Sequence, residues 1–368
     1  MPAEKPQRTG MENKKTFPFS VSSFLQGLGA AGVILLLLTG WMWLRAEDTQ
    51  ERLQERLPSK TVLIERKSAP EHPVSPPSQD EEEISQEEPS HESTPQGRPD
   101  TALAPAPLPG LYESGAEGRL PIARLEDGVT PFEAYKRPFE RVMERPLIAV
   151  AFADAGLSKD LTGKISTHFP PEVTLILNPY AKGLNAWGDK ARLDGHEIWL
   201  SLPMENETYP NPDPGPRTLL INASLPQNQE RLFETLSSVV GYAGIVTQKD
   251  HRFTAESAGT PSLLEQIFGR GLGFANANTH LPFFGAKTAK ENGSPFVQTD
   301  LWIERGFRPQ EIEAALAQTE RMALQNGSAA LFIEPSPLTL DMAKDWLETL
   351  EEKSLQLAPL SALAGIKL

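Results

Sequence analysis

The sequence predicts an α/β domain in residues 111–368, preceded by one transmembrane helix and a long polar tether. Three observations lead to this prediction. Short apolar segments of strand length alternate with helical patterns from about Arg145 onward. An uncharged apolar segment occupies residues 24–44, and an acidic, proline-rich stretch separates it from the domain. Alternating strands and helices are typical of a (β/α) barrel or a doubly wound sheet, and the size and strand number favour the barrel.

The composition of the 368-residue chain excludes several classes of protein. It contains no cysteine, which excludes a disulfide-stabilised scaffold, a thiol nucleophile and a thiolate metal site. Its formal net charge of −14 argues against general nucleic-acid binding, which requires a cationic face, so we expect no nucleic-acid partner. The sequence also lacks a Gly-x-Ser-x-Gly elbow, a phosphate-binding loop and an HExxH pair.

Residues 24–44 are predicted to cross a membrane once. The segment carries no charge, contains the apolar run Val33–Leu38, and ends near Trp41 and Trp43, whose indoles favour the membrane interface. At 1.5 Å per residue such a helix reaches about 30 Å, the hydrocarbon thickness of a bilayer. A cleaved signal peptide has a shorter apolar region, so we favour an uncleaved span. Lys and Arg are balanced on its two sides, and we expect residues 1–23 to be a cytoplasmic tail because short amino-terminal tails usually stay inside.

Residues 45–110 are predicted to form an extended tether. They contain 11 of the 34 prolines and carry 14 acidic against 7 basic residues, a net charge of −7. Such a segment buries too little apolar surface to offset its ordering entropy, and proline and charge repulsion keep it extended. We expect a solvated spacer. The alternative is that the acidic run Asp80–Glu83 binds a cationic partner.

Strands and helices alternate in the remainder of the chain. The predicted strands are Leu147–Phe152, Val173–Leu177, Ile198–Leu202, Tyr242–Val246 and Ala330–Ile333. Because their apolar residues run without alternation, they suit strands buried on both faces, as in a parallel sheet. One helix is predicted to start at Ser224–Pro226, with Leu232, Phe233, Leu236 and Val240 on one face. A second begins at Pro309 and ends near Asn326–Gly327, and Met342, Trp346 and Leu350 mark a third.

Three acidic residues follow predicted strands, at the rim where parallel barrels place their working groups. Asp154 comes after the first strand, where its carboxylate could bind a metal, act as a base or cap the next helix. Glu205 comes after the third strand and could line a pocket. Glu334 comes after the last strand, as a pocket acid or a helix cap.

Two histidines and a glutamine complete the set of candidates. Gln248 and His251 follow the fourth strand, in a charged segment whose composition equally suits a solvated loop. His196 precedes the third strand, on the opposite rim, where a structural histidine is the alternative to a ligand or a base.

The segments that carry these residues resemble the divergent polysaccharide deacetylase family. The matching segments are Leu147–Gly156, Asn178–Ala181, Gly195–Glu197, Leu202–Glu205, Tyr209–Leu220, Gly241–Gly244 and Arg252–Thr254. Their order and spacing hold from about residue 110 to the carboxyl terminus. The resemblance implies a distorted (β/α) barrel of about seven strands. It also implies a single-pass protein of the bacterial inner membrane, with the carboxyl-terminal domain in the periplasm.

The resemblance also implies a chemistry from which this sequence departs. The related deacetylases remove N-acetyl groups from amino sugars with a divalent metal, a carboxylate base and a histidine acid. Ala153 stands at the position of the base and Asp154 at that of a metal ligand. Ser201 and Glu205 stand where the relatives have metal-binding histidines. The cofactor stays open, and we expect that a divalent metal could bind, though not tightly.

These comparisons assign a role to each candidate. Asp154 and Glu205 are the candidate catalytic residues, and Asp154 is also the candidate metal ligand. The candidate substrate-binding residues are His196, Gln248, His251 and Glu334.

Three functions remain open. The first is a membrane-anchored envelope protein that binds or acts on amino-sugar polymers with weak or no hydrolase activity, the sugar rings stacking on Trp187, Trp199 or Tyr209. The second is a working metal-dependent N-deacetylase, a hydrolase of amide C–N bonds with substituted ligands. The third is an envelope scaffold that binds protein partners which the sequence does not identify.

Overall fold

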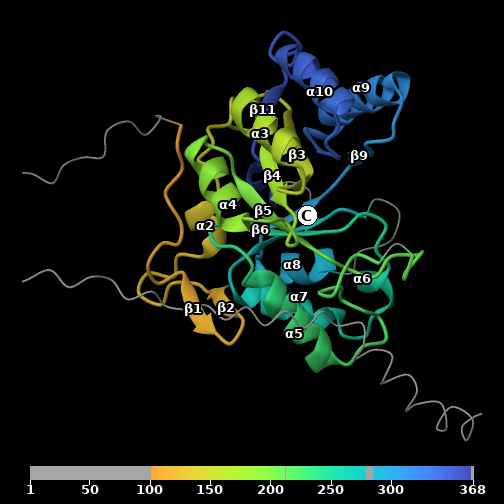
Figure 1. Ribbon diagram of the computed structural model, residues 1–368. Coiled ribbons are helices and arrows are strands. Elements are labelled where there is room, and N and C mark those ends of the chain that lie inside the picture. Colours follow the sequence, from red (N-terminus) through yellow and green to blue (C-terminus); the bar gives the residue numbers. More distant parts are fainter. Residues whose placement is uncertain (1–100, 212, 279–284, 366–368) are drawn as a thin grey trace, which may run out of the picture. The chain divides into compact units, whose positions relative to one another are not determined.

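The computed structural model describes residues 101–211, 213–278 and 285–365 (Figure 1). The predicted tail (1–23), transmembrane helix (24–44) and first part of the tether (45–100) lie outside these residues. Across the described ranges, no helix is both long and apolar enough to cross a membrane. The amide of Leu103 donates to the carbonyl of Arg192 over 2.8 Å, and the Leu103 side chain is buried. Leu103, which lies in the predicted tether, is therefore attached to α4 of the folded domain.

The described chain forms a small hairpin and a larger parallel sheet. The strands are β1 (Tyr112–Gly115), β2 (Gly118–Pro121), β3 (Leu147–Ala155), β4 (Thr174–Leu177), β5 (Ile198–Leu202), β6 (Gly244–Thr247), β7 (Gly273–Asn276), β8 (Phe296–Gln298), β9 (Leu301–Ile303), β10 (Ser328–Ile333) and β11 (Gln356–Ala358). The helices are α2 (Pro131–Tyr135), α3 (Lys159–His168), α4 (Leu184–Leu193), α5 (Leu225–Leu236), α6 (Phe253–Glu256), α7 (Thr260–Gly269), α8 (Gly285–Asn292), α9 (Pro309–Asn326) and α10 (Pro337–Glu348), followed by a 3₁₀ turn (Leu360–Leu363).

The large sheet is parallel and curled. Its strand order is β8-β7-β6-β5-β4-β3-β10-β9, and β11 adds to the start of β3. The strands at its two ends, β8 and β9, follow each other in the chain. Between them, the amide of Thr299 donates to Asn276 at the end of β7, and that of Asp300 donates to Ala330 in β10. The expected α/β fold is confirmed. The sheet is a curled half-barrel with eight strands along its path and β11 as a ninth beside β3, whereas the prediction was a distorted barrel of about seven strands.

Several of the longer helices pack against the strands of the sheet (Figure 1). Helix α4 contacts β4 and β5, α5 contacts β5, α7 contacts β7, and α9 contacts β9 and β10. The three predicted helices are confirmed as α5, α9 and α10. A capping box of Ser224 and Gln227 begins α5, and Gly327, with φ of 79°, ends α9. Val240 lies beyond α5, which ends at Leu236, and the Ser238 hydroxyl donates to the carbonyl of Thr235 near the helix end.

Strand β3 shows why the predicted strands are apolar throughout. Ile148, Val150 and Phe152 pack toward the helices, while the alternate residues Leu147, Ala149 and Ala151 belong to a separate cluster inside the curl. Both faces of the strand are therefore buried. Burying one Val, Leu, Ile or Phe side chain contributes about 1.5–3 kcal/mol, so both layers stabilise the sheet.

The interior of the curl is filled by the buried indole of Trp199 on β5. Its ring packs edge-on against Phe132, with centroids 6.4 Å apart. A Cβ atom at Gly273 on β7 would lie 2.8 Å from ring atoms of both aromatic side chains, which real Cβ contacts do not allow. Glycine at position 273 is therefore required by the size of the indole inside the sheet.

Candidate functional site

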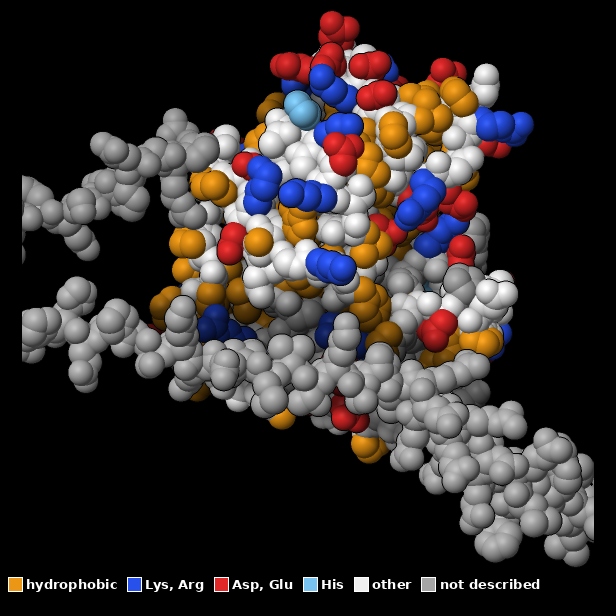
Figure 2. All heavy atoms as spheres, in the orientation of Figure 1, with side chains coloured by type: hydrophobic (Ala, Val, Ile, Leu, Met, Phe, Trp, Pro, Cys, Tyr) orange, Lys and Arg blue, Asp and Glu red, His pale blue; other side chains and the backbone are white. Residues whose placement is uncertain are grey.

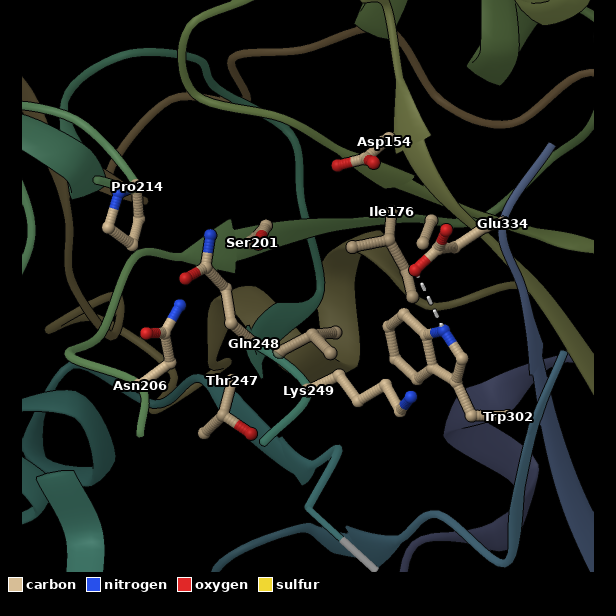
Figure 3. Close-up of a pocket in the computed structure, with 12 residues that line it drawn as sticks. Asp154, Ile176, Ser201, Asn206, Pro214, Thr247, Gln248, Lys249, Trp302 and Glu334 are labelled. Carbon is tan, nitrogen blue, oxygen red and sulfur yellow. Dashed lines mark hydrogen bonds between the residues drawn. The ribbon is translucent and has the colours of Figure 1, made fainter. Parts of the chain in front are cut away.

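The carboxyl ends of the strands surround a cavity of about 240 Å³ (Figure 3). Ile176, Val246 and Trp302 supply an apolar lining. Trp302, on β9, packs on Phe332 of β10 at a centroid distance of 5.6 Å. The volume is below the roughly 300–1,000 Å³ of pockets for drug-sized ligands, so it suits one small ring.

Polar side chains occupy the opposite side of the cavity. Ser201, Asn206, Thr247 and Gln248 line it, and Figure 3 shows Gln248 and Asn206 facing it across from Trp302. The Gln248 side-chain oxygen accepts a hydrogen bond of 3.4 Å from the amide of Met204. The cavity thus pairs an aromatic face with neutral hydrogen-bonding groups.

Asp154 reaches the cavity through an irregular backbone. The pairing of β3 with β4 shifts register between Phe152 and Ala155, and Asp154 has φ of 55°. A bulge of this kind redirects a side chain, and strained non-glycine residues in this region cluster at functional sites. The carboxylate accepts a hydrogen bond of 3.0 Å from Asn178 Nδ2 and one of 2.6 Å from Arg305 Nη2. It does not cap α3, whose cap is Ser158.

Glu334 lies beside Asp154 at the end of the adjacent strand. Its Oε1 accepts a hydrogen bond of 3.1 Å from Trp302 Nε1. Its Oε2 accepts from Arg305 twice, from Nε at 3.0 Å and from the backbone amide at 3.3 Å. The helix-cap alternative for Glu334 is wrong, because Ser336 caps α10.

Two cations accompany these carboxylates. Arg305 binds both Asp154 and Glu334, and the hydrogen bond to Glu334 is the largest cause that raises the pKa of its guanidinium. Lys249 forms ion pairs with Glu304 and, at 3.4 Å, with Asp250. Burial alone lowers the pKa of the Lys249 amine, but the two carboxylates outweigh it and the pKa is raised. Each of the two cations is therefore shared by two carboxylates, and this side of the cavity keeps a net negative charge.

The cavity brings together three of the six predicted site residues, Asp154, Gln248 and Glu334. Glu205 lies next to this site but is not among its lining residues. Its Oε2 accepts a hydrogen bond of 2.9 Å from the amide of Ile221 and so holds the loop that follows β5.

The two predicted histidines lie elsewhere. His251 is buried, with Nε2 at 3.1 Å from Asn276 Oδ1, and burial lowers the pKa of its imidazole to about 4. His196 is buried at the amino end of β5, with ring nitrogens 2.7 Å from the carbonyl of Val173 and 3.2 Å from that of Ser166. Burial also lowers the pKa of His196. Neither imidazole lines the cavity, and both serve to join chain segments.

Sequence reasoning missed Trp302, Arg305 and Asn178. Leu301–Ile303 is too short for a periodic pattern, so the strand carrying Trp302 gives no signal of its own. The available signal was that Glu304 and Arg305 follow an apolar triplet, as Asp154 follows its strand. Of the predicted stacking aromatics, Trp199 is fully buried and Trp187 packs against the outer core.

The donor set does not fit a divalent metal. In the ranges that the structure describes, no three His, Cys, Asp or Glu side chains converge to hold an ion. Each oxygen of the Asp154 and Glu334 carboxylates already accepts a hydrogen bond from a protein donor. A hard cation would need several of these oxygens as ligands at about 2.0–2.6 Å, and Arg305 bridges the two carboxylates instead.

Comparison with known proteins identifies one family. The model described as divergent polysaccharide deacetylase matches residues 152–364. Among solved structures, the chain is similar to the crystal structure of an uncharacterised protein from Agrobacterium tumefaciens C58. The two have 28% sequence identity and a TM-score of 0.63, over 67% of this chain and 99% of that chain. No curated protein matches this chain.

Proposed function

The chain belongs to the divergent polysaccharide deacetylase family, and from this premise we propose that its domain binds amino-sugar polymers, with weak or no hydrolase activity. The bound unit is one pyranose ring held in the cavity beside Trp302. We further propose that residues 24–44 anchor the protein in the bacterial inner membrane as a single span, with the domain in the periplasm.

The observation that carries the proposal is the placement of Trp302. Its ring lines a cavity of about 240 Å³ whose other side presents neutral polar groups. A pyranose has an apolar face that packs on an indole and hydroxyls that need hydrogen-bond partners, and both features meet here. Trp302 is held by Glu334 and Phe332 before any ligand arrives, which lowers the entropic cost of binding.

Weak or absent hydrolysis follows from the groups at the rim. Ala153 supplies no base beside Asp154, and both oxygens of the Asp154 carboxylate are engaged by Asn178 and Arg305. General acid–base catalysis contributes about 10²–10⁴ in rate, so its loss alone makes turnover slow. The side chains around the cavity therefore support sugar binding more than they support amide hydrolysis.

Calorimetric titration of the full chain in detergent with oligomers of N-acetylglucosamine tests the proposal. We expect saturable heat, with an affinity that Trp302→Ala lowers and Trp187→Ala retains. Trp187 is the matched control because it is also half-buried and does not line the cavity. Absence of heat at millimolar sugar would contradict the proposal.

A further inference from the structure

Two carboxylates from neighbouring strands converge on one guanidinium. Arg305 Nη2 lies 2.6 Å from Asp154 Oδ2, and Arg305 Nε lies 3.0 Å from Glu334 Oε2. Asp154 ends β3 and Glu334 follows β10, the strand beside it in the sheet. Two like charges within the span of one guanidinium repel each other unless a cation lies between them.

The remaining contacts of the pair come from donors. The second Asp154 oxygen accepts from Asn178 Nδ2 at 3.0 Å. The side-chain oxygen of Asn178 accepts a hydrogen bond of 3.0 Å from the backbone amide of Tyr180. Turning that oxygen toward Asp154 would break this hydrogen bond. The second Glu334 oxygen accepts from Trp302 Nε1. The second oxygen of each carboxylate is therefore already engaged by a hydrogen-bond donor of the protein.

Arg305 is anchored as well as paired. Its backbone amide donates to Glu334 at 3.3 Å, and the amide of Glu334 donates to the carbonyl of Ile303 at 2.8 Å. A guanidinium stays charged at every pH a protein survives, and its planar fork suits two carboxylates at once. The cation is therefore permanent and its position is set by the backbone.

We propose that Arg305 is a built-in cation that occupies the place between Asp154 and Glu334 and excludes divalent ions from it. The chain satisfies both carboxylates with one of its own side chains. The proposal goes beyond sugar binding and does not depend on it.

The consequence is a latent ion site that appears when the guanidinium is removed. In Arg305→Gln, two carboxylates would face each other without their cation, and hard divalent ions bind carboxylate oxygens. The Arg305 side chain is 56% exposed, so its replacement leaves no core cavity and the variant is expected to fold. Arg305→Lys keeps a positive charge and should stay free of ions.

Thermal unfolding of the full chain in detergent, with and without millimolar Ca²⁺ or Mn²⁺, tests this. We expect the ions to raise the Tm of Arg305→Gln by about 3 °C or more, and to leave the wild type and Arg305→Lys unchanged. The double variant Arg305→Gln with Asp154→Asn should lose the response. Terbium luminescence excited through tryptophan gives a second readout, since Trp302 contacts Glu334.

Three results would overturn the proposal. One is an ion-induced shift in the wild type that Asp154→Asn abolishes. Another is the absence of both a shift and terbium binding in Arg305→Gln. The third is a shift that survives in the double variant, which would place the ion elsewhere. A failed sugar titration would leave all of these measurements unaffected, so the two proposals can fail separately.

Discussion

Trp302 and Glu334 face one cavity from adjacent strands, and the indole Nε1 donates to the Glu334 carboxylate over 3.1 Å (Figure 3). This bond fixes the aromatic face that we propose to hold a sugar ring. It also links that face to the charged group formed by Glu334, Arg305 and Asp154. Aromatic and ionic parts of the site are therefore coupled through one carboxylate.

Replacing Trp302 should weaken sugar binding in proportion to the aromatic area lost. We expect Trp302→Ala to raise the Kd for an N-acetylglucosamine oligomer by about tenfold or more, corresponding to ~1.4 kcal/mol. Trp302→Phe keeps an aromatic face and should change the Kd by less than about threefold. Calorimetry measures both values, and equal losses in the two variants would mean that stacking is not the main contact.

Neutralising Glu334 should separate the two roles of this carboxylate. Glu334→Gln can still accept from Trp302 Nε1 but no longer pairs with Arg305. Because Arg305 is more than half exposed, we expect a stability change of less than about 1 kcal/mol in urea unfolding and nearly unchanged sugar affinity. Glu334→Ala also removes the bond to Trp302 and should weaken sugar binding. Equal affinities for the two variants would contradict the coupling.

His251 should make the domain less stable in mild acid. Its pKa is about 4 when folded and about 6.5 when unfolded, so between these values the unfolded chain binds more protons. Its contribution is therefore fully present above pH 6.5 and declines as the pH falls toward 4. Between pH 7.5 and 5 we expect a loss of about 2 kcal/mol from this residue.

The pH dependence can be assigned by substitution. Urea unfolding of His251→Gln should show a shallower decline from pH 7.5 to pH 5 than the wild type. His168→Gln, at an exposed position, is the control and should retain the wild-type decline. If His251→Gln and wild type lost equal stability over this range, another group would be responsible.

The indole inside the sheet should make Gly273 intolerant of a side chain. Gly273→Ala would place a methyl group 2.8 Å from ring atoms of Phe132 and Trp199, and we expect a loss of about 1–3 kcal/mol. Gly163→Ala on α3 is the control, because nothing lies near its Cβ position and alanine favours a helix. Denaturant unfolding compares the two. A neutral Gly273→Ala would mean that the ring has room to move.

Element type was predictable where burial is complete and the segment is long. Strand β3 is apolar on both faces, and α9 has a proline at its start and a glycine after its end, so local patterns define both. Strand β7 was not predictable from its four residues. They include Gly273, which leaves room for the ring of Trp199, and Asn276, whose side chain donates a hydrogen bond to Gln298. The residues of such a short strand are determined by contacts with other parts of the chain, so the strand shows no clear pattern of apolar residues.

Only part of the site was predictable, for a related reason. Asp154 and Glu334 stand at strand ends and were identified from position. Arg305 meets Asp154 across 151 residues of sequence, and that contact depends on the curl that brings β9 beside β10 and β10 beside β3. A contact between residues so far apart in sequence cannot be predicted from a local sequence pattern.

On the face shown in Figure 2, basic and acidic side chains are interspersed over the described residues. Among the described residues, several charged side chains form ion pairs along a helix, including Lys164 with Asp160 in α3 and Lys190 with Asp194 at the end of α4. The strand-end cavity remains the place where aromatic, polar and charged groups converge.

The most direct test measures the heat of sugar binding and the release of acetate in the same sample. An oligomer of N-acetylglucosamine is titrated into the full chain, and the same solution is then assayed for acetate with and without added divalent metal. We predict saturable heat that depends on Trp302, with little or no acetate released from the oligomer. Metal-dependent acetate release that Asp154→Ala abolishes, or no heat at all, would contradict the account.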